Sequence, residues 1–256
     1  MDAPVDYRLS GHAAWLTLNS PENHNALSNA LCLAFNQALA KAVNEPRARV
    51  IVLTGTGKSF CAGADLKGSG GGAVGEAQDT PPPFVKSMEQ LWNCPKPVIG
   101  RIQGSAFGGG LGLLAACDIA LVADTARFAF TEVRLGLSPN IISVFVLRKA
   151  PLARLTPLFL SGQRFDPHQA REMGLASEVV PANDLDDAVT ALIGELAACG
   201  PNALKDVKSL LRTVPGLSIT EGLEWAWKNN RRQFTSDEAK EGMRAFAEKR
   251  KPAWVE

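Results

Sequence analysis

One acidic side chain and two turns of small residues are the parts of this sequence best suited to chemistry. The first turn covers residues 61–65 (CAGAD) and the second covers residues 108–110 (GGG). Glycine and alanine let another molecule approach the main chain closely, so N–H groups from both turns can converge as an oxyanion hole. Such a hole holds the negative charge that develops on a carbonyl oxygen, and losing one donor costs about 3 kcal/mol of barrier.

Glu132 is the candidate acid or base. It stands close to Phe130, Val133 and Leu135, and an apolar setting disfavours the charged carboxylate and raises its pKa toward neutrality. The alternative is a structural role for Glu132, as a helix cap or as the salt-bridge partner of Arg134. Each turn taken alone also fits an ordinary tight connection, but the two turns in this order favour a functional site.

A dinucleotide site is the competing interpretation of the second turn. Residues 110–115 (GLGLLA) fit the pattern G-x-G-x-x-A, and Asp124 ends the next predicted strand. The acidic residue of that motif stands about 20 residues after the first glycine, and Asp124 comes earlier. The helix between them is too short for a full strand–helix–strand unit. We therefore favour the oxyanion hole.

The elements that must position these turns alternate between strands and helices. Apolar residues alternate or run continuously where we expect strands, and they recur on one face where we expect helices. From residue 151 onward only helices are expected, so the sequence predicts an α/β body with a helical appendage. The predicted strands are a hairpin at 7–19 and single strands at 48–55, 96–104, 118–124 and 126–132. The predicted helices are 28–45, 84–92, 111–117, 152–160, 167–173, 184–198, 202–212, 220–234 and 236–251, and a loose glycine-rich segment is expected at 68–83.

Composition narrows the classes of function. The chain has 256 residues, a hydrophobic share of 46% and a formal net charge of +1, which allows a sizeable core and predicts neither a nucleic-acid nor a membrane partner. No apolar run approaches membrane-spanning length, and the first residues do not resemble a signal peptide. Five cysteines without a CxxC pair predict reduced thiols in a cytoplasmic protein. No His, Asp or Glu cluster has metal-ligand spacing, so no metal is expected.

Five segments of the sequence resemble the crotonase superfamily, the enoyl-CoA hydratase/isomerase proteins. They are residues 59–67 (SFCAGADLK), 104–124 (GSAFGGGLGLLAACDIALVAD), 126–139 (ARFAFTEVRLGLSP), 162–180 (GQRFDPHQAREMGLASEVV) and 241–254 (EGMRAFAEKRKPAW). The resemblance implies a spiral of ββα turns with the CoA-thioester site in residues 1–200, followed by a helical oligomerisation region in residues 201–256. It also implies a homo-oligomer, either a trimer or a dimer of trimers. No separate cofactor is implied, because coenzyme A is part of the substrate.

The resemblance further implies which residues bind an acyl-CoA thioester. The oxyanion donors would be the main-chain N–H groups of Ala64 and Gly109. Asp65 would be a structural hydrogen-bonding residue rather than a base, in keeping with the turn-forming habit of aspartate. Phe246 and Lys249 would meet the adenine and phosphates of a neighbouring subunit's ligand, with ordinary helix packing as the alternative. The implied CoA-binding positions are Asn25, Ala26, Leu27, Ala62, Ala64, Asp65, Leu66, Lys67, Gly109, Phe246 and Lys249.

At residue 112 the sequence departs from the typical hydratases of this superfamily. Those enzymes use two glutamates; Gly112 stands where the first is expected, and Glu132 matches the second. With one glutamate we expect an enoyl-CoA hydratase that adds water across the 2,3 double bond. The alternative is an enoyl-CoA delta-isomerase that moves the double bond with the same glutamate.

Two further alternatives belong to other classes. The first is a protein of this fold that binds CoA without catalysing a reaction. In such a protein, a catalytic residue such as the missing glutamate would be lost first. A nucleophilic dehalogenase or thioesterase would need another nucleophile near the carbonyl, and Gly112 leaves one place for it empty. The run LSPNIISVFVL after Gly136 is similar to a bacterial subgroup that includes methylglutaconyl-CoA hydratases, which favours the hydratase.

Overall fold

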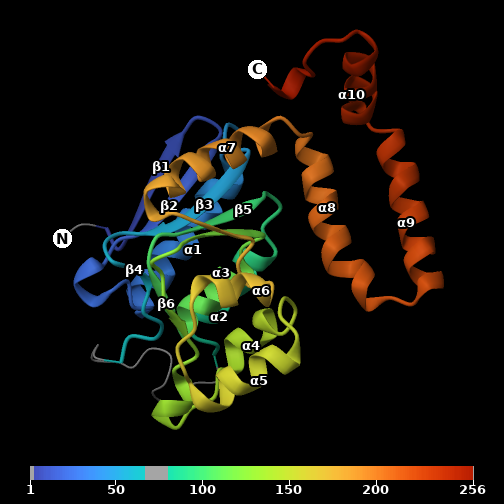
Figure 1. Ribbon diagram of the computed structural model, residues 1–256. Helices are drawn as coiled ribbons and strands as arrows, with labels where there is room; N and C mark the ends of the chain where they lie inside the picture. Colours follow the sequence, from blue (N-terminus) through green and yellow to red (C-terminus); the bar gives the residue numbers. More distant parts are fainter. Residues whose placement is uncertain (1–2, 67–79, 256) are drawn as a thin grey trace.

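The larger of two β-sheets forms the centre of the body (Figure 1). The computed structural model describes residues 3–66 and 80–255. The strands of this sheet are β1 (Val5–Ser10), β2 (Ala13–Leu18), β3 (Val50–Gly55), β5 (Val98–Ile102), β7 (Ile119–Ala123) and β9 (Glu178–Val180). They lie side by side in the order β1-β2-β3-β5-β7-β9. The first two form the predicted antiparallel hairpin, and all other neighbours are parallel.

The strands of a second, smaller sheet each follow a strand of the larger sheet along the chain. Its parallel strands are β4 (Ser59–Cys61), β6 (Ser105–Phe107) and β8 (Phe128–Ala129), in that order across the sheet. Each follows one of the neighbouring strands β3, β5 and β7 after a short loop. The chain therefore advances from one sheet to the other three times, which is the expected strand–strand–helix spiral.

Strand β3 shows why the larger sheet lies in the middle of the body. All six of its residues are buried, as expected for a parallel strand that is covered on both faces. Val50 and Val52 pack in the cluster that includes residues of helix α7 (Leu185–Ala197), whereas Ile51 and Leu53 belong to the main core. Successive side chains of β3 thus point to opposite faces of the sheet and pack in two different hydrophobic cores.

Helices surround the sheets and then extend beyond them. The main core is closed by α1 (Asn29–Asn44), α2 (Pro83–Trp92), α3 (Gly109–Ala116), α4 (Asn140–Val146), α5 (Leu152–Ser161) and α6 (Pro167–Glu172). The chain ends in α8 (Pro201–Thr213), α9 (Ile219–Phe234) and α10 (Asp237–Ala247). Figure 1 shows α9 and α10 standing away from the body, beyond α8.

An ion-pair cluster attaches α8 to the body. Lys208 is only 6% exposed, and its Nζ lies 2.5 Å from Oδ2 of Asp118. Nη2 of Arg212 lies 3.1 Å from Oδ1 of the same aspartate. The Arg212 guanidinium also lies over the ring of Trp92, 4.7 Å from its centroid. These contacts place α8 with the body, whereas α9 and α10 keep large apolar side chains in solvent.

Several sequence-based element assignments are corrected by the structure. The short strands β4, β6 and β9 and the helix α4 were not expected from the sequence. Strand β8 covers only Phe128–Ala129 of the predicted 126–132, because the chain turns into the 3₁₀ helix η2 (Glu132–Leu135). Helix α10 ends at Ala247 rather than near 251, since Lys249 has a left-handed φ of 54°. Residues 67–79 of the glycine-rich segment lie outside the described residues.

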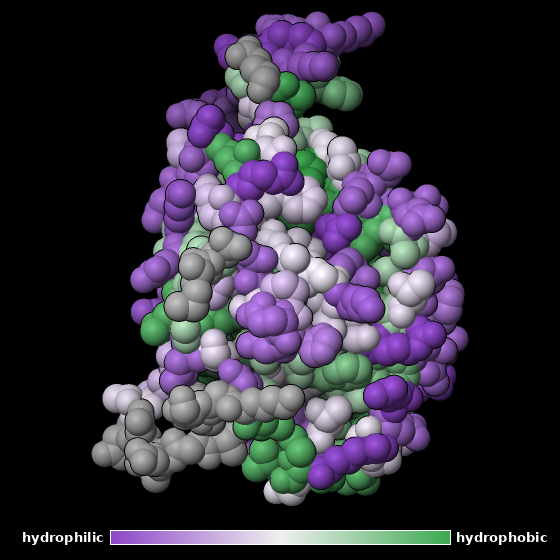
Figure 2. Space-filling view, turned by 90° about the vertical axis from the view of Figure 1, so that its left-hand side faces the viewer, coloured by the Kyte–Doolittle hydropathy of each residue, from purple (hydrophilic) through white to green (hydrophobic). Residues whose placement is uncertain are grey.

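Apolar side chains are unevenly distributed over the described surface. Figure 2 shows a face that is mostly hydrophilic, with hydrophobic side chains gathered at its lower end, at the height of α4 and α5 in Figure 1. Leu147 in this region is 45% exposed, and Leu152 and Leu160 are 68% and 73% exposed. The described apolar surface is therefore concentrated near α4–α5 and on the C-terminal helices.

Candidate active site

The parallel strands of the smaller sheet each end directly before one predicted site residue. Ala64 follows β4, Gly109 follows β6 and Glu132 follows β8. Because neighbouring parallel strands run in the same direction, their carboxyl ends lie at one edge of the sheet. All three residues accordingly line one cavity of about 420 Å³.

The two small-residue turns are in direct contact. Gly63 has a φ of +88°, and a Cβ on it would lie 2.7 Å from the carbonyl oxygen of Phe107 and 3.3 Å from the nitrogen of Gly109. A Cβ on Gly109 would lie 2.6 Å from Cδ1 of Leu27. At Gly63 only glycine allows this approach, because φ is left-handed and the neighbouring atoms belong to the main chain, whereas at Gly109 the neighbouring atom is the end of a side chain. The turns are therefore stripped of side chains because their main chains pack against each other at the cavity.

Main-chain N–H groups are available at this contact. Within residues 3–66 and 80–255, no main-chain acceptor takes the N–H of Ala64 or of Gly109. Gly109 is the first residue of α3, and the first N–H groups of a helix have no acceptor inside it. The helix dipole adds partial positive charge at the same end. This wall of the cavity therefore suits a negatively charged oxygen.

Glu132 places a carboxylate against the second turn. A Cβ on Gly108 would lie 3.1 Å from Oε1 of Glu132, and Gly108 itself has a φ of +47°. Among the described residues, the buried Oε2 atom has no hydrogen-bond partner, and burial raises the pKa of the Glu132 carboxyl. Arg134 does not pair with it; its Nε donates to the carbonyl oxygen of Ser161 at 3.3 Å. The carboxylate therefore lies close to the second turn, and no ion pair with it occurs among the described residues.

The remaining walls of the cavity come from segments that the sequence did not identify as part of a site. They are apolar apart from two polar side chains, Ser138 and Asn140. Phe84 comes from α2, and the other residues come from the loop before α4 and from its first turn. These additional lining residues are Phe84, Gly136, Leu137, Ser138, Pro139, Asn140, Ile141 and Ile142. The only sequence signal was the similarity of the run after Gly136 to a bacterial subgroup of the superfamily, and that similarity did not place the run at the cavity.

Gly112, where the first of the two glutamates was expected, faces a filled space. A Cβ on Gly112 would lie 2.4 Å from Cγ2 and 3.0 Å from Cβ of Ile142, and 3.5 Å from Cε of Met88. Ile142 is 3% exposed and Met88 is 1% exposed. A glutamate side chain would need the volume that Ile142 now occupies. The described cavity lining contains one carboxylate, that of Glu132.

The loop that carries Asn25, Ala26 and Leu27 is built onto the first turn. Asn25 is fully buried, and its Nδ2 donates to the carbonyl oxygens of Thr56 and Ser59 at 2.9 Å. The N–H of Leu27 donates to the carbonyl oxygen of Gly63 at 2.7 Å. The Asn25 side chain is thus used to hold the loop in place, and Leu27 is the member of this trio that lines the cavity.

The other implied CoA positions lie along the first turn. The N–H of Ala62 donates to the carbonyl oxygen of His24 at 3.0 Å. Asp65 is partly buried, and Leu66 is 56% exposed at the end of the described segment. Lys67 lies outside the described residues.

Phe246 and Lys249 lie apart from this cavity within one chain. Phe246 projects from α10 and is 88% exposed, and Lys249 follows the end of that helix. Neither residue lines the cavity, and Figure 1 shows α10 at the top of the view, away from α3 and α4, which contribute to the cavity lining. Their assignment to a neighbouring subunit's ligand stays a prediction.

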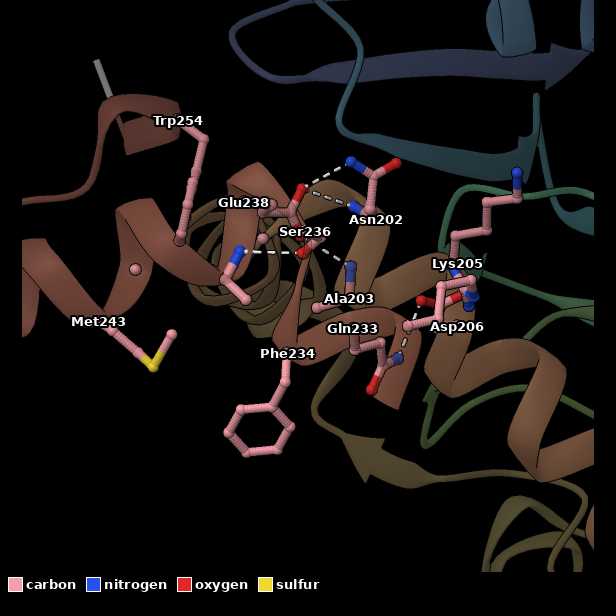
Figure 3. Close-up of a pocket in the computed structure, with 14 residues that line it drawn as sticks. Asn202, Ala203, Lys205, Asp206, Gln233, Phe234, Ser236, Glu238, Met243 and Trp254 are labelled. Carbon is pink, nitrogen blue, oxygen red and sulfur yellow. Dashed lines mark hydrogen bonds and ion pairs between the residues drawn. The ribbon is translucent and has the colours of Figure 1, made fainter. Parts of the chain in front are cut away.

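A larger hollow, of about 550 Å³, lies among the C-terminal helices (Figure 3). Its Glu238 carboxylate accepts hydrogen bonds from the main-chain N–H groups of Asn202 and Ala203, at 3.0 and 2.8 Å. Gln233 Nε2 donates to Oδ2 of Asp206 at 2.9 Å. These polar groups are paired with one another, and none of the predicted site residues lines the hollow. It therefore does not compete with the Glu132 cavity as a site of chemistry.

Thiol and metal chemistry gain no support from the described residues. Cys61 begins the first turn, but burial raises the pKa of its thiol to about 12, which leaves it uncharged and a poor nucleophile. Cysteines 32, 94 and 117 are buried as well, and Cys199 is exposed; all are free thiols. No group of three or more potential metal ligands occurs in residues 3–66 and 80–255. No helix in that part of the chain is long and apolar enough to span a membrane.

The chain is similar to known proteins over nearly its whole length. A family model described as enoyl-CoA hydratase/isomerase matches residues 10–256. A carnitinyl-CoA dehydratase of Salmonella arizonae is 34% identical over 245 residues, which are 93% of each chain. The enoyl-CoA hydratase EchA19 of Mycobacterium tuberculosis is 32% identical over 255 residues, which are 98% of this chain and 95% of the relative. The crystal structure of an enoyl-CoA hydratase from Shewanella pealeana matches with a TM-score of 0.91 at 31% identity, covering 98% of this chain and 96% of that one.

Proposed function

This chain belongs to the enoyl-CoA hydratase/isomerase family and has the crotonase fold, and from that premise we propose that it is an enoyl-CoA hydratase. It adds water across the 2,3 double bond of an acyl-CoA thioester. Glu132 is the only acid/base side chain in this proposal, and the N–H groups of Ala64 and Gly109 bind the thioester oxygen.

The observation that carries the proposal is the placement of Glu132. Its carboxylate has a buried oxygen without a hydrogen-bond partner among the described residues, in a cavity that it shares with Ala64 and Gly109. An unpaired buried carboxylate is unfavourable for folding, so its position is better explained by a role in proton transfer. The raised pKa suits such a role, because general bases work best when their pKa lies near the working pH.

The two N–H groups make the reaction possible by polarising the thioester. When its oxygen lies between the amides of Ala64 and Gly109, electron density moves away from C3, which becomes open to attack by water. Glu132 takes a proton from that water as the oxygen–C3 bond forms, and the electrons of the double bond pass to C2 and the thioester oxygen. The protonated Glu132 then returns this proton to C2, and the second hydrogen of the water stays on the new C3 hydroxyl. Both hydrogens and the oxygen of one water molecule are thereby added.

The isomerase is the second candidate, because the described cavity holds a single carboxylate. In that reaction Glu132 removes a proton from C4 and returns it to C2, and no water is needed. The names of relatives favour water chemistry, since one is a hydratase and another a dehydratase.

The test is to offer the purified protein a set of 2-enoyl-CoA and 3-enoyl-CoA thioesters of several chain lengths. The hydratase predicts loss of the conjugated enoyl absorbance with the 2-enoyl substrates, and formation of 3-hydroxyacyl-CoA that contains oxygen from labelled water. Conversion of the 3-enoyl substrates alone, without incorporation of that oxygen, would replace the hydratase by the isomerase. Binding of saturated acyl-CoA without turnover of either series would instead support the non-catalytic CoA-binding protein.

A further inference from the structure

Ile142 occupies a position in the cavity that bears directly on which acyl groups can enter. It comes from the first turn of α4 and lines the same cavity as Ala64, Gly109 and Glu132. Its Cγ2 atom fills the space in front of Gly112, at 2.4 Å from the place of a Cβ. The contact between α3 and α4 is therefore as close as the absence of a side chain at residue 112 permits.

The geometry of α3 relates this contact to the reacting carbons. Gly109 and Gly112 are separated by three residues of one helix, so they lie on the same face, about 4.5 Å apart along the helix axis. An acyl oxygen bound at the Gly109 N–H leaves the next carbons of the acyl group within a few bond lengths of that face. The Ile142 side chain, which covers Gly112, consequently lies on the wall of the cavity that the acyl chain of such a ligand would enter.

The packing around Ile142 gives it little freedom to move aside. The side chain is 3% exposed, and Met88, which also faces Gly112, is 1% exposed. β-branched side chains in helices have one strongly preferred rotamer. A substituent on the acyl chain that reaches Ile142 therefore meets a fixed wall rather than a yielding one.

We propose that Ile142 sets the acyl specificity of this site by occupying the volume that a branch on the acyl chain would need. The inference deepens the proposed hydratase function and rests on it. Gly112 contributes to the same effect, because the absence of a side chain lets Ile142 approach α3. It also leaves the described cavity lining without a second carboxylate.

The test compares Ile142→Ala with a matched variant, Ile141→Ala, which removes the same atoms from a neighbouring residue that lines the cavity but does not meet Gly112. The readout is the ratio of kcat/KM for 2-methylcrotonyl-CoA and 3-methylcrotonyl-CoA to that for crotonyl-CoA. We expect Ile142→Ala to raise at least one ratio by about tenfold, the usual value of one methyl group in an apolar pocket. Ile141→Ala should leave both ratios close to wild type, and Ile142→Val should lie between wild type and Ile142→Ala.

Binding measurements separate this inference from the proposed function. Dissociation constants for butyryl-CoA, isobutyryl-CoA and isovaleryl-CoA need no turnover, so they report on the wall even if the chemistry is different. Wild-type protein that hydrates crotonyl-CoA while Ile142→Ala and Ile142→Val leave every branched-to-unbranched ratio unchanged would overturn the role of Ile142 and spare the hydratase. Equal shifts in Ile141→Ala and Ile142→Ala would overturn it as well.

Discussion

The raised pKa of the Glu132 carboxyl follows from burial rather than from a charged neighbour. Desolvation is the largest contribution to the raised pKa of the Glu132 carboxyl, and no ion pair to Glu132 occurs among the described residues. Its side chain is fixed against the main chain of Gly108. A base with an elevated pKa accepts a proton more readily, provided that it is ionised at the working pH.

This gives a pH dependence with a defined sign. Attack by water requires ionised Glu132, so kcat/KM for a 2-enoyl-CoA should fall as the pH is lowered through the pKa of this carboxyl. Because burial raises that pKa, the midpoint should lie above the ordinary glutamate value of about 4.3. A profile of kcat/KM against pH measures it, with the stability of the protein checked at each pH. An acid limb centred at or below the ordinary value would contradict the role of burial.

At the scale of elements, the contact between α3 and α4 decides the shape of the cavity. Gly112 leaves room for Ile142, and a helix pair that is this close cannot accept an added methyl without moving. We expect Gly112→Ala to lower the free energy of unfolding by about 1–3 kcal/mol. The matched control is Gly194→Ala in α7, where a Cβ meets nothing within 4 Å; it should raise that free energy by up to about 1 kcal/mol. Urea unfolding of both variants measures the difference, and equal effects would show that residue 112 has free space.

The attachment of α8 offers a second test at this scale. Asp118→Asn leaves the buried Lys208 without its carboxylate, and breaking a buried pair from one side costs about 3–5 kcal/mol. Asp118 is itself partly exposed, at 22%, so we expect a loss toward the lower end of that range. The control is Asp186→Asn, which removes the partner of Arg101; Asp186 is 71% exposed, and such surface pairs contribute up to about 1 kcal/mol. Chemical denaturation that gives the same loss for both variants would refute the anchoring role of Asp118.

Elements also show what the sequence could predict. The helices at 28–45 and 184–198 and the hairpin at 7–19 carried strong periodic patterns, and they are present nearly as expected. Strands β4 and β6 have three residues each, which is too short for an alternating apolar pattern to be recognised. They are strands because they pair with neighbouring strands of the smaller sheet. Helix α4 was missed because it lies inside the run after Gly136, which was interpreted only as a similarity to a bacterial subgroup. The site residues Ala64, Gly109 and Glu132 could thus be predicted from the sequence. The part of the cavity lining that includes Ile142 could be found only from the three-dimensional structure.

At the scale of the whole molecule, the C-terminal helices carry large exposed apolar side chains. Ile219, Leu223, Trp227 and Phe246 are between 65% and 88% exposed, which is unusual for large apolar side chains in a monomer. We expect a trimer or a dimer of trimers, in which these helices meet other copies. Light scattering should give a trimeric or hexameric mass, and Leu223→Asp combined with Trp227→Asp should lower it. Lys228→Asp, a change at an exposed site of the same helix, should leave it unchanged; a monomeric wild type would contradict the expectation.

In the proposed reaction, two turns bind one thioester oxygen, and one carboxylate moves the protons. The most direct measurement is the turnover of a 2-enoyl-CoA by Glu132→Gln, alongside the dissociation constant of a saturated acyl-CoA. General acid–base groups contribute about 10²–10⁴-fold, so kcat should fall by at least about 10²-fold while the dissociation constant changes little. Turnover by Glu132→Gln at the wild-type rate would contradict the account.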